Sequence, residues 1–230
     1  MSVLSGTLSR FRTPTLEEDA LLHPLSPEAE PFRMLRAGIR FSSVERPLRT
    51  LLIAAPRPRS GKSTIAANLA LSFSQVGERV LLVDADLRRP SLSRIFNIQA
   101  RVGLTTLLLR GGDLSEHVVT DIHEGLDLMP SGPLPPNPSE LLSSQRLVDA
   151  LARMAENYDV VLLDAPPALL TTDSIILASL VDGTLCVVDL KSTRRRDVQR
   201  TMGLLDRAGA RVIGTCVNRY GRAARGESYY

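Results

Sequence analysis

The chain has 230 residues, 43% of them hydrophobic and 23% charged, which is long enough to bury a full core. Two cysteines, many aliphatic residues and no apolar run near the roughly 18 residues of a membrane span exclude a disulfide scaffold, a disordered chain and a membrane anchor. The formal net charge of only +3 gives no argument for nucleic-acid binding.

The N-terminal part of the chain is predicted to be an arm followed by a helix. Residues 1–12 lack the apolar segment of a secretion signal, so we expect a cytoplasmic protein. Residues 1–27 mix prolines with Ser, Thr and acidic residues without any period, which predicts a flexible arm. Residues 28–43 carry apolar side chains at helical spacing after Ser26 and Pro27, and are predicted to form an amphipathic interface helix.

Beyond Pro47, short aliphatic runs alternate with helical segments. Runs without polar alternation are typical of strands buried on both faces, as in parallel sheets. These runs cover residues 51–55, 80–83, 126–129, 160–163, 185–188 and 212–217. Helices are predicted over residues 62–76, 105–110, 139–157, 172–180 and 195–208. The alternation predicts one α/β domain over residues 28–218, a doubly wound, mostly parallel sheet flanked by helices.

Two segments fall outside this alternation. Residues 130–138 hold five prolines in nine positions and are predicted to form a surface loop. Residues 219–230 are small, basic and aromatic, with no aliphatic side chain to bury, and are predicted to form a mobile tail.

The first strand-to-helix junction has the composition of a phosphate-binding loop. It reads Pro58, Arg59, Ser60, Gly61, Lys62, Ser63, Thr64. Backbone N–H groups and the helix N-terminus would face an anion, Lys62 would reach the phosphates, and the Ser63 hydroxyl would reach Mg²⁺. The loop lacks its usual first glycine, and Arg59 places a Cβ in a turn that often requires positive φ. A Ser/Gly turn with a solvated lysine is the alternative interpretation.

Carboxylates follow two other predicted strands at the edge where ligands bind in such sheets. Asp84 and Asp86 come after the second aliphatic run, and Asp164 directly follows the fourth. An acidic residue after a buried strand is typical of a Mg²⁺ site, although such residues also simply end strands. Three strand ends with phosphate or magnesium ligands at one edge favour a nucleotide site.

In the order APRPRSGKST, VDADLRRP and VVLLDAPP, these motifs resemble the cytoplasmic module of the bacterial tyrosine kinases (BY-kinases) of capsule and exopolysaccharide export. BY-kinases belong to the P-loop superfamily of Par/Min-type ATPases, and the resemblance spans roughly residues 26–230. It implies that ATP and Mg²⁺ are cofactors, with nucleotide held by the loop from Pro58 to Thr64. It further implies that Lys62, Asp84, Asp86 and Asp164 are catalytic, and that Ser63, Asp84 and Asp164 hold the metal.

The resemblance also assigns residues outside the loop. Glu30, Arg33 and Arg36 fit the family's E-x-x-R-x-x-R motif for ring-like self-association, although the spacing also suits an ordinary charged helix face. Asn218 and Arg219 resemble the segment that lies against the adenine. The phosphoacceptors implied are Tyr220, Tyr229 and Tyr230.

The resulting hypothesis is an ATP-dependent protein-tyrosine autokinase that regulates polysaccharide polymerisation and export. The family implies a homo-oligomer and a separate inner-membrane partner of the chain-length-regulator (polysaccharide co-polymerase) type, which would recruit the chain to the membrane face. A first alternative is a pseudokinase that acts as a regulatory binding module, because Arg59 replaces a loop glycine. A second alternative is a partitioning-type ATPase, in which Arg57 would take the place of that group's signature lysine.

Overall fold

The computed structural model describes residues 21, 23, 26–42 and 47–219, and this part of the chain is built on one seven-stranded sheet. The strand order is β3-β4-β2-β5-β1-β6-β7, and all neighbours are parallel except β3 and β4. The strands are β1 (Thr50–Ala54), β2 (Val80–Asp84), β3 (Val119–His123), β4 (Leu126–Met129), β5 (Val160–Asp164), β6 (Gly183–Asp189) and β7 (Val212–Asn218). The predicted doubly wound α/β fold is confirmed.

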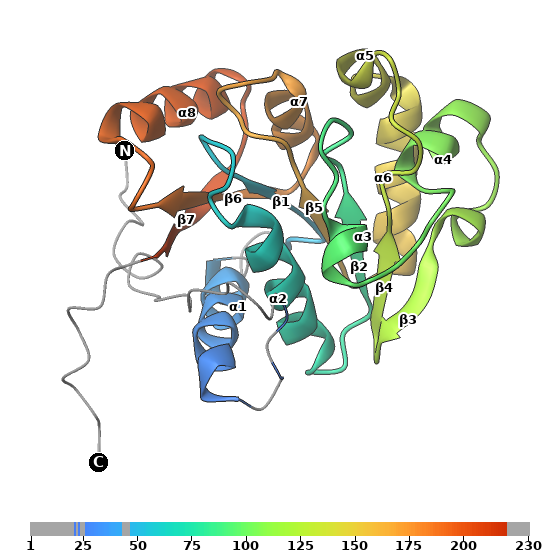
Figure 1. Cartoon of the computed structure of the whole chain (residues 1–230), viewed down its shortest axis with the longest axis horizontal. Coiled ribbons are helices and arrows are strands. Elements are labelled where there is room, and N and C mark those ends of the chain that lie inside the picture. Colours follow the sequence, from blue (N-terminus) through green and yellow to red (C-terminus); the bar gives the residue numbers. More distant parts are fainter. Residues whose placement is uncertain (1–20, 22, 24–25, 43–46, 220–230) are drawn as a thin grey trace.

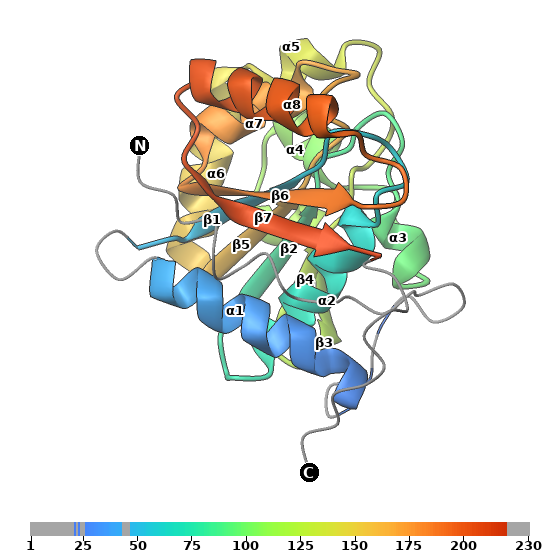
Figure 2. The ribbon, with the colours of Figure 1, turned by 90° about the vertical axis from the view of Figure 1, so that its left-hand side faces the viewer.

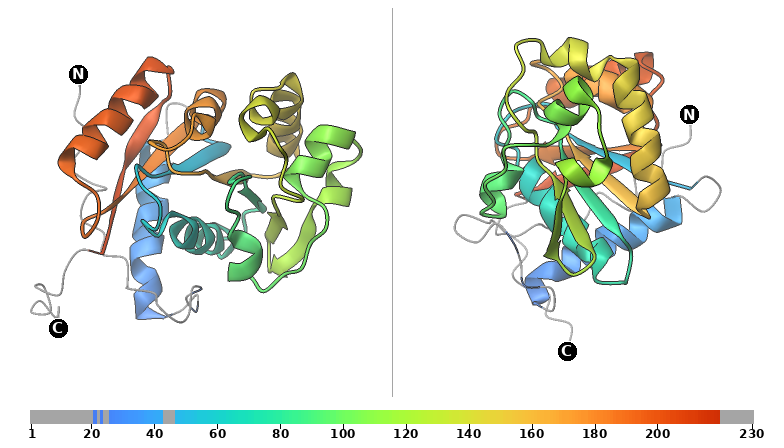
Figure 3. Two further views of the ribbon diagram at one scale, coloured as in Figure 1. Left: turned by 45° about the horizontal axis from the view of Figure 1, so that its top comes forward. Right: turned by 90° about the vertical axis from the view of Figure 1, so that its right-hand side faces the viewer.

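Helices cover both faces of the sheet, α1 and α2 on one and α4 to α8 on the other (Figures 1 and 3). The helical elements are η1 (Pro27–Ala29), α1 (Glu30–Ser42), α2 (Lys62–Ser74), α3 (Leu92–Ile95), α4 (Leu104–Arg110), η2 (Leu114–His117), α5 (Pro138–Leu142), α6 (Gln145–Asn157), α7 (Asp173–Leu180) and α8 (Arg195–Arg207). The sheet edge formed by β6 and β7 lies between α8 and α1 (Figure 2).

The core has two halves, one on each side of the sheet. On one side, Phe32, Leu35 and Ile39 of α1 join α2 and the strands in one buried cluster. On the other, residues such as Leu147 of α6 and Leu177 of α7 form the second. Burying each such side chain contributes roughly 1.5–3 kcal/mol to the stability of the fold. Because helices cover both faces of the sheet, the central strands are apolar on both faces, and the polar site residues lie at their carboxyl ends.

Two parts of the sequence-based prediction were wrong in detail. The helix expected over residues 139–157 is two helices, because the Ser143 and Ser144 hydroxyls donate to the carbonyls of Glu140 and Leu141 and break the helical course. The short α3 and the antiparallel edge strand β3 were not predicted. Among the described residues, no helix has both the length and the apolar character needed to cross a membrane.

Candidate active site

The loop between β1 and α2 adopts the strained backbone that its sequence suggested. Arg59 has φ 59° and Gly61 has φ 82°, both in the left-handed region. A left-handed conformation costs a residue with a Cβ about 1–2 kcal/mol, so the loop accepts Arg59 at a modest penalty. At Gly61 a Cβ would also lie 2.2 Å from the Asn218 Nδ2, so any other residue would displace the Asn218 side chain from its hydrogen bond to the loop. Both the backbone conformation and the packing therefore favour glycine before Lys62.

Asn218 joins the end of β7 to this loop. Its buried Nδ2 donates to the Ser60 carbonyl at 2.8 Å, and its Oδ1 accepts from the Arg219 backbone N–H at 2.9 Å. The Arg219 guanidinium lies 3.3 Å from Asp189 Oδ2 on the neighbouring strand. Of the two residues expected near the nucleotide, Asn218 thus contacts the backbone of the phosphate loop, whereas the Arg219 side chain contacts Asp189 at the end of β6.

The three predicted carboxylates converge on Lys62 at the carboxyl ends of β2 and β5. Asp84 and Asp164 are register partners in adjacent strands. The Lys62 Nζ lies 2.9 Å from Asp164 Oδ1 and 3.9 Å from Asp86 Oδ2, and it donates to the Ser63 Oγ at 3.1 Å. All four charged side chains are buried. A buried ammonium among buried carboxylates is the arrangement expected of a charged active centre rather than of a solvated turn.

Oxygen atoms at this centre lack protein partners. Asp84 Oδ2 accepts from the backbone N–H groups of Ser91 and Leu92, both at 2.9 Å, but its Oδ1 has no partner, nor has Asp164 Oδ2. Orphaned buried carboxylate oxygens fit Mg²⁺, which prefers oxygen ligands and usually keeps waters beside one or two carboxylates. Within the described ranges, no group of three or more His, Cys, Asp or Glu side chains forms an all-protein metal cage.

Burial controls the protonation of these carboxylates. Desolvation, reinforced by the charge of Asp164, raises the pKa of Asp84 to about 7, although the two backbone N–H donors oppose the shift. Desolvation also raises the pKa of Asp164, and the neighbouring Lys62 ammonium offsets this only in part. Asp84 can therefore gain or lose a proton near neutral pH.

A second network that the sequence analysis missed supports the loop after β2. The Asp86 Oδ1 accepts from the backbone N–H groups of Arg88 and Arg89. The Arg88 guanidinium donates to both oxygens of Asp173, at 2.7 and 3.2 Å, and to Ser139 Oγ at 2.9 Å. Because Asp173 begins α7 and Ser139 lies in α5, this network connects three elements. Asp173 follows no buried strand, so only its proximity in the fold could reveal it.

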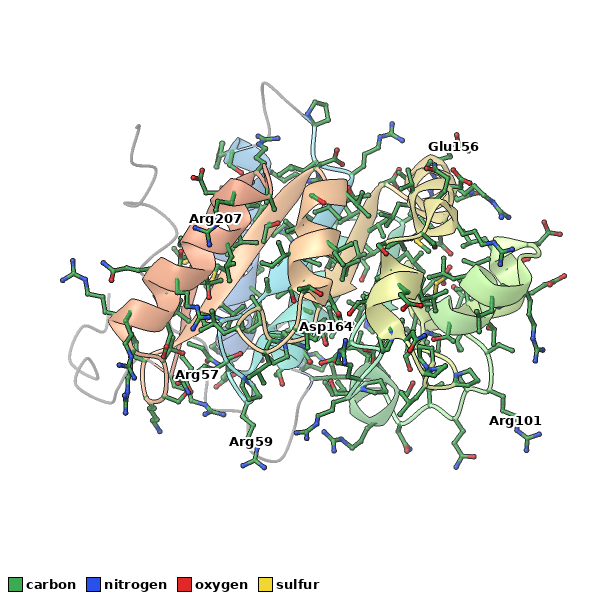
Figure 4. The ribbon with its side chains drawn as sticks, turned by 90° about the horizontal axis from the view of Figure 1, so that it is seen from above. Arg57, Arg59, Arg101, Glu156, Asp164 and Arg207 are labelled. Atoms are coloured by element: carbon green, nitrogen blue, oxygen red, sulfur yellow. The ribbon has the colours of Figure 1, made fainter. Side chains whose placement is uncertain are left out.

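Arg57 has a partner within its own chain. Its Nε donates to Asp197 Oδ2 of α8 at 2.7 Å. Asp197 also accepts from the Arg194 backbone N–H at 3.2 Å. In Figure 4, Arg57 and Arg59 lie to one side of Asp164, whereas Arg101 lies at the opposite end of the domain.

The residues predicted for self-association make contacts inside the domain. Glu30 and Arg33 form an ion pair at 2.5 Å along α1. Arg36 donates to the Ser72 carbonyl and, at 3.1 Å, to the Ser72 Oγ of α2. The Arg36 contact helps to hold α1 on α2, the Glu30–Arg33 pair lies within α1, and the interface role of all three residues stays a prediction. The predicted phosphoacceptors Tyr220, Tyr229 and Tyr230 lie outside the described residues.

Comparison with known proteins identifies the family. An AAA domain model matches residues 49–202. The tyrosine-protein kinase YwqD of Bacillus subtilis is 37% identical over 199 residues, covering 86% of this chain and 84% of YwqD. The chain belongs to the bacterial tyrosine-protein kinase family. Within this family, the putative tyrosine-protein kinase CapB of Staphylococcus aureus is 33% identical over 90% of both chains.

Solved structures agree with this assignment. The chimerical protein CapA2B2 is 34% identical and superposes with a TM-score of 0.82, covering 87% of this chain and 88% of that one. MinD from Pyrococcus horikoshii, solved with Mg-ADP, has a TM-score of 0.66 at 24% identity over 77% of this chain and 72% of its own, which shows a shared P-loop fold. This fold implies nucleotide binding. Some relatives are far longer, since the chain spans only 29% of the Salmonella typhimurium kinase Wzc.

Proposed function

We propose that the chain is an ATP-dependent protein-tyrosine autokinase that regulates the polymerisation and export of a polysaccharide. One observation carries the proposal: a buried Lys62–Asp164 pair lies beside orphaned oxygens of Asp84 and Asp164, at the mouth of a phosphate loop. Relatives named as tyrosine-protein kinases, among them CapB, support this specific activity over nucleotide binding alone.

The chain's own groups account for nucleotide binding. The loop from Pro58 to Gly61 and the first turn of α2 present backbone N–H groups to the phosphates of ATP. Lys62 exchanges its contact with Asp164 for the phosphate oxygens, and Asn218 keeps the loop backbone in place through Ser60. Ser63, Asp84 and Asp164 would hold Mg²⁺, which when bound neutralises charge on the phosphates.

The transfer step needs an acceptor hydroxyl and a proton acceptor. The phenolic oxygen of a tail tyrosine attacks the γ-phosphorus, the bond from that phosphorus to the bridging β-phosphate oxygen breaks, and ADP leaves. The phenolic proton passes to a carboxylate of the Asp84–Asp86 pair. A carboxylate within hydrogen-bond reach of the phenol favours loss of its proton, and Asp86 is the member of the pair that would not hold the metal. Catalysis is then mostly positioning and electrostatic stabilisation.

The acceptors and partners complete the proposal. Tyr220, Tyr229 and Tyr230 are the phosphoacceptors, delivered between subunits of a homo-oligomer whose interface includes Glu30, Arg33 and Arg36. A separate inner-membrane protein of the chain-length-regulator type recruits the oligomer to the membrane face. The greater length of relatives such as Wzc is compatible with a kinase that works together with further protein segments.

Intact mass spectrometry after incubation with Mg-ATP tests the activity. We expect additions of about 80 Da per phosphate on wild type and none on Lys62→Met. The only other lysine, the exposed Lys191, gives a matched control, and Lys191→Met should be phosphorylated like wild type. A variant with all three tail tyrosines replaced by Phe should also gain no mass.

The same experiment decides the alternatives. An unmodified wild-type chain that binds nucleotide, even with its membrane partner supplied, would identify a pseudokinase. Release of phosphate without added mass, unchanged by the tyrosine replacements, would identify a partitioning-type ATPase.

A further inference from the structure

A group of exposed cations surrounds the start of α8 and has no role in the proposed phosphotransfer. It consists of Lys191, Arg194, Arg195, Arg196 and Arg200, which we name the α8 basic cluster. All five side chains are exposed, and none forms an ion pair with a described residue. The nearest carboxylate in sequence, Asp197, is buried and already bound to Arg57. Five exposed cations and one buried carboxylate within ten residues give this surface an excess of positive charge, which attracts multivalent anions.

The last described residue before the C-terminal tail shares a contact with the start of this cluster. Arg219, the last described residue, is ion-paired at 3.3 Å with Asp189 at the end of β6. The Asp189 carboxylate also accepts from the Lys191 backbone N–H at 3.0 Å and from the Ser192 hydroxyl at 2.5 Å. The loop that begins the cluster and the residue that begins the tail thus share one buried carboxylate, at the sheet edge beneath α8 in Figure 2.

The tail is long enough to reach every cation of the cluster. Residues 220–230 can extend up to about 36 Å at roughly 3.3 Å per residue. The α8 helix has 13 residues and is only about 20 Å long at 1.5 Å per residue. Tyr229 and Tyr230 can therefore reach either end of α8 from their own chain.

Phosphorylation reverses the charge of the tail. Residues 220–230 contain Arg222, Arg225 and Glu227, so the side chains of the unmodified segment sum to +1 and offer the cluster no excess of negative charge. Each phosphotyrosine adds about −1.5 to −2 charges, so phosphates on all three tyrosines make the segment about −4. The buried carboxylates around Lys62 repel this product, whereas arginine forks bind phosphate oxygens in pairs.

We infer that the α8 basic cluster binds the phosphotyrosines of the chain's own tail, an inference that rests on the proposed autokinase activity. The unmodified tail is free to reach a neighbouring subunit's site, and the phosphorylated tail is retained on α8. The cluster therefore keeps phosphorylated tails away from the active sites of neighbouring subunits. The fraction of clusters that hold a tail rises with the extent of phosphorylation.

A binding assay with a synthetic tail tests this inference. The receptor is the full chain with Tyr220, Tyr229 and Tyr230 replaced by Phe, so that its own tail cannot compete. The probe is a fluorescent peptide of residues 219–230, with phosphate on Tyr229 and Tyr230 or with none. By fluorescence anisotropy at 150 mM salt, we expect the phosphopeptide to bind at least about tenfold more tightly than the unmodified peptide.

Charge reversal locates the binding surface. The variant Arg195→Glu, Arg196→Glu, Arg200→Glu should lose phosphopeptide affinity by about tenfold or more, and its folding is favoured by acidic residues in the first turn of α8. The matched control reverses three exposed arginines of α3, α4 and the segment between them, which lie away from α8 (Figure 1). The variant Arg94→Glu, Arg101→Glu, Arg110→Glu should keep wild-type affinity. Should the first variant unfold by circular dichroism, replacement of the same three arginines by Gln serves instead.

Three results would overturn the inference. Equal affinity for the two peptides, or an equal loss of phosphopeptide affinity in the two triple variants, would show that binding depends only on the overall charge of the protein. Binding of phosphatidylglycerol vesicles through Arg195, Arg196 and Arg200, without binding of the phosphopeptide, would make the cluster a lipid-binding surface. Because the peptide carries phosphate introduced by synthesis, the assay gives its answer even if the chain itself transfers none.

Discussion

The molecule presents positive charge in two contrasting ways. Lys62 is a single ammonium group, 8% exposed, that lies among three buried carboxylates and forms ion pairs with two of them, Asp86 and Asp164. The α8 basic cluster is five exposed cations with no described ion-pair partner. Burial strengthens the electrostatic interactions of Lys62, so the loss of one charged atom there has a large effect. Solvent and salt weaken each interaction of the α8 basic cluster, so its attraction for anions depends on several side chains together and tolerates single substitutions. Chemistry belongs to the first kind of region and recruitment of ligands to the second.

Removal of Lys62 should have the largest effect. Lys62→Met leaves Asp164 buried without its cation, so we expect phosphotransfer to vanish and the free energy of unfolding to fall by roughly 3 kcal/mol at pH 8. The double variant Lys62→Met, Asp164→Asn should recover most of that stability but none of the activity. Urea unfolding with a phosphotyrosine assay measures both, and a double variant as unstable as the single would contradict the pairing.

Arg88 lies between the two extremes, because its guanidinium is partly exposed while its partner Asp173 is fully buried. Arg88→Ala frees the loop that carries Asp86, so we expect kcat to fall about 10–100-fold while KM for ATP changes little. Arg89→Ala is the matched control, since that exposed neighbour makes only a backbone contact to Asp86. An equal loss of kcat in both variants would assign the effect to charge rather than to positioning.

Asp84 provides a test by pH. The pKa of Asp84 is raised from 3.8 in the unfolded chain to about 7 in the native state. Ionisation of Asp84 therefore destabilises the native state as the pH rises from about 4 to about 7. In metal-free buffer, Asp84→Asn should gain roughly 2 kcal/mol of stability over wild type between pH 5 and pH 8 while losing activity. Parallel stability curves for the two proteins over that range would show that Asp84 is not buried as a charge.

Arg59 should show the smallest effect. Arg59→Gly removes the strain of a left-handed conformation at a residue with a Cβ, which stabilises the native state. Glycine also raises the conformational entropy of the unfolded chain, which opposes this gain, so the free energy of unfolding should change by less than about 1 kcal/mol. Gly61→Ala, two residues on, should instead be strongly destabilising because its Cβ meets Asn218. Thermal unfolding compares the two variants, and a larger loss in Arg59→Gly would contradict the loop geometry.

The sequence predicted best where a local pattern has one meaning. Uninterrupted aliphatic runs identified the parallel strands, and the tetrapeptide from Gly61 to Thr64 located the loop, including the positive φ at Arg59. The strand β3 was missed because its side chains are mostly exposed or half-buried and its pairing is irregular. The Arg88–Asp173–Ser139 network joins residues far apart in sequence, and no periodicity encodes such a contact.

The hydrogen bond from Asn218 to the Ser60 carbonyl has a mechanical consequence. Asn218, the last residue of β7, is thereby tied to the phosphate loop, so a shift of that loop on nucleotide binding would be passed to Asn218 and to the backbone that follows it. A fluorophore placed just after Arg219 should therefore report nucleotide binding, and a bulky fusion there should weaken it.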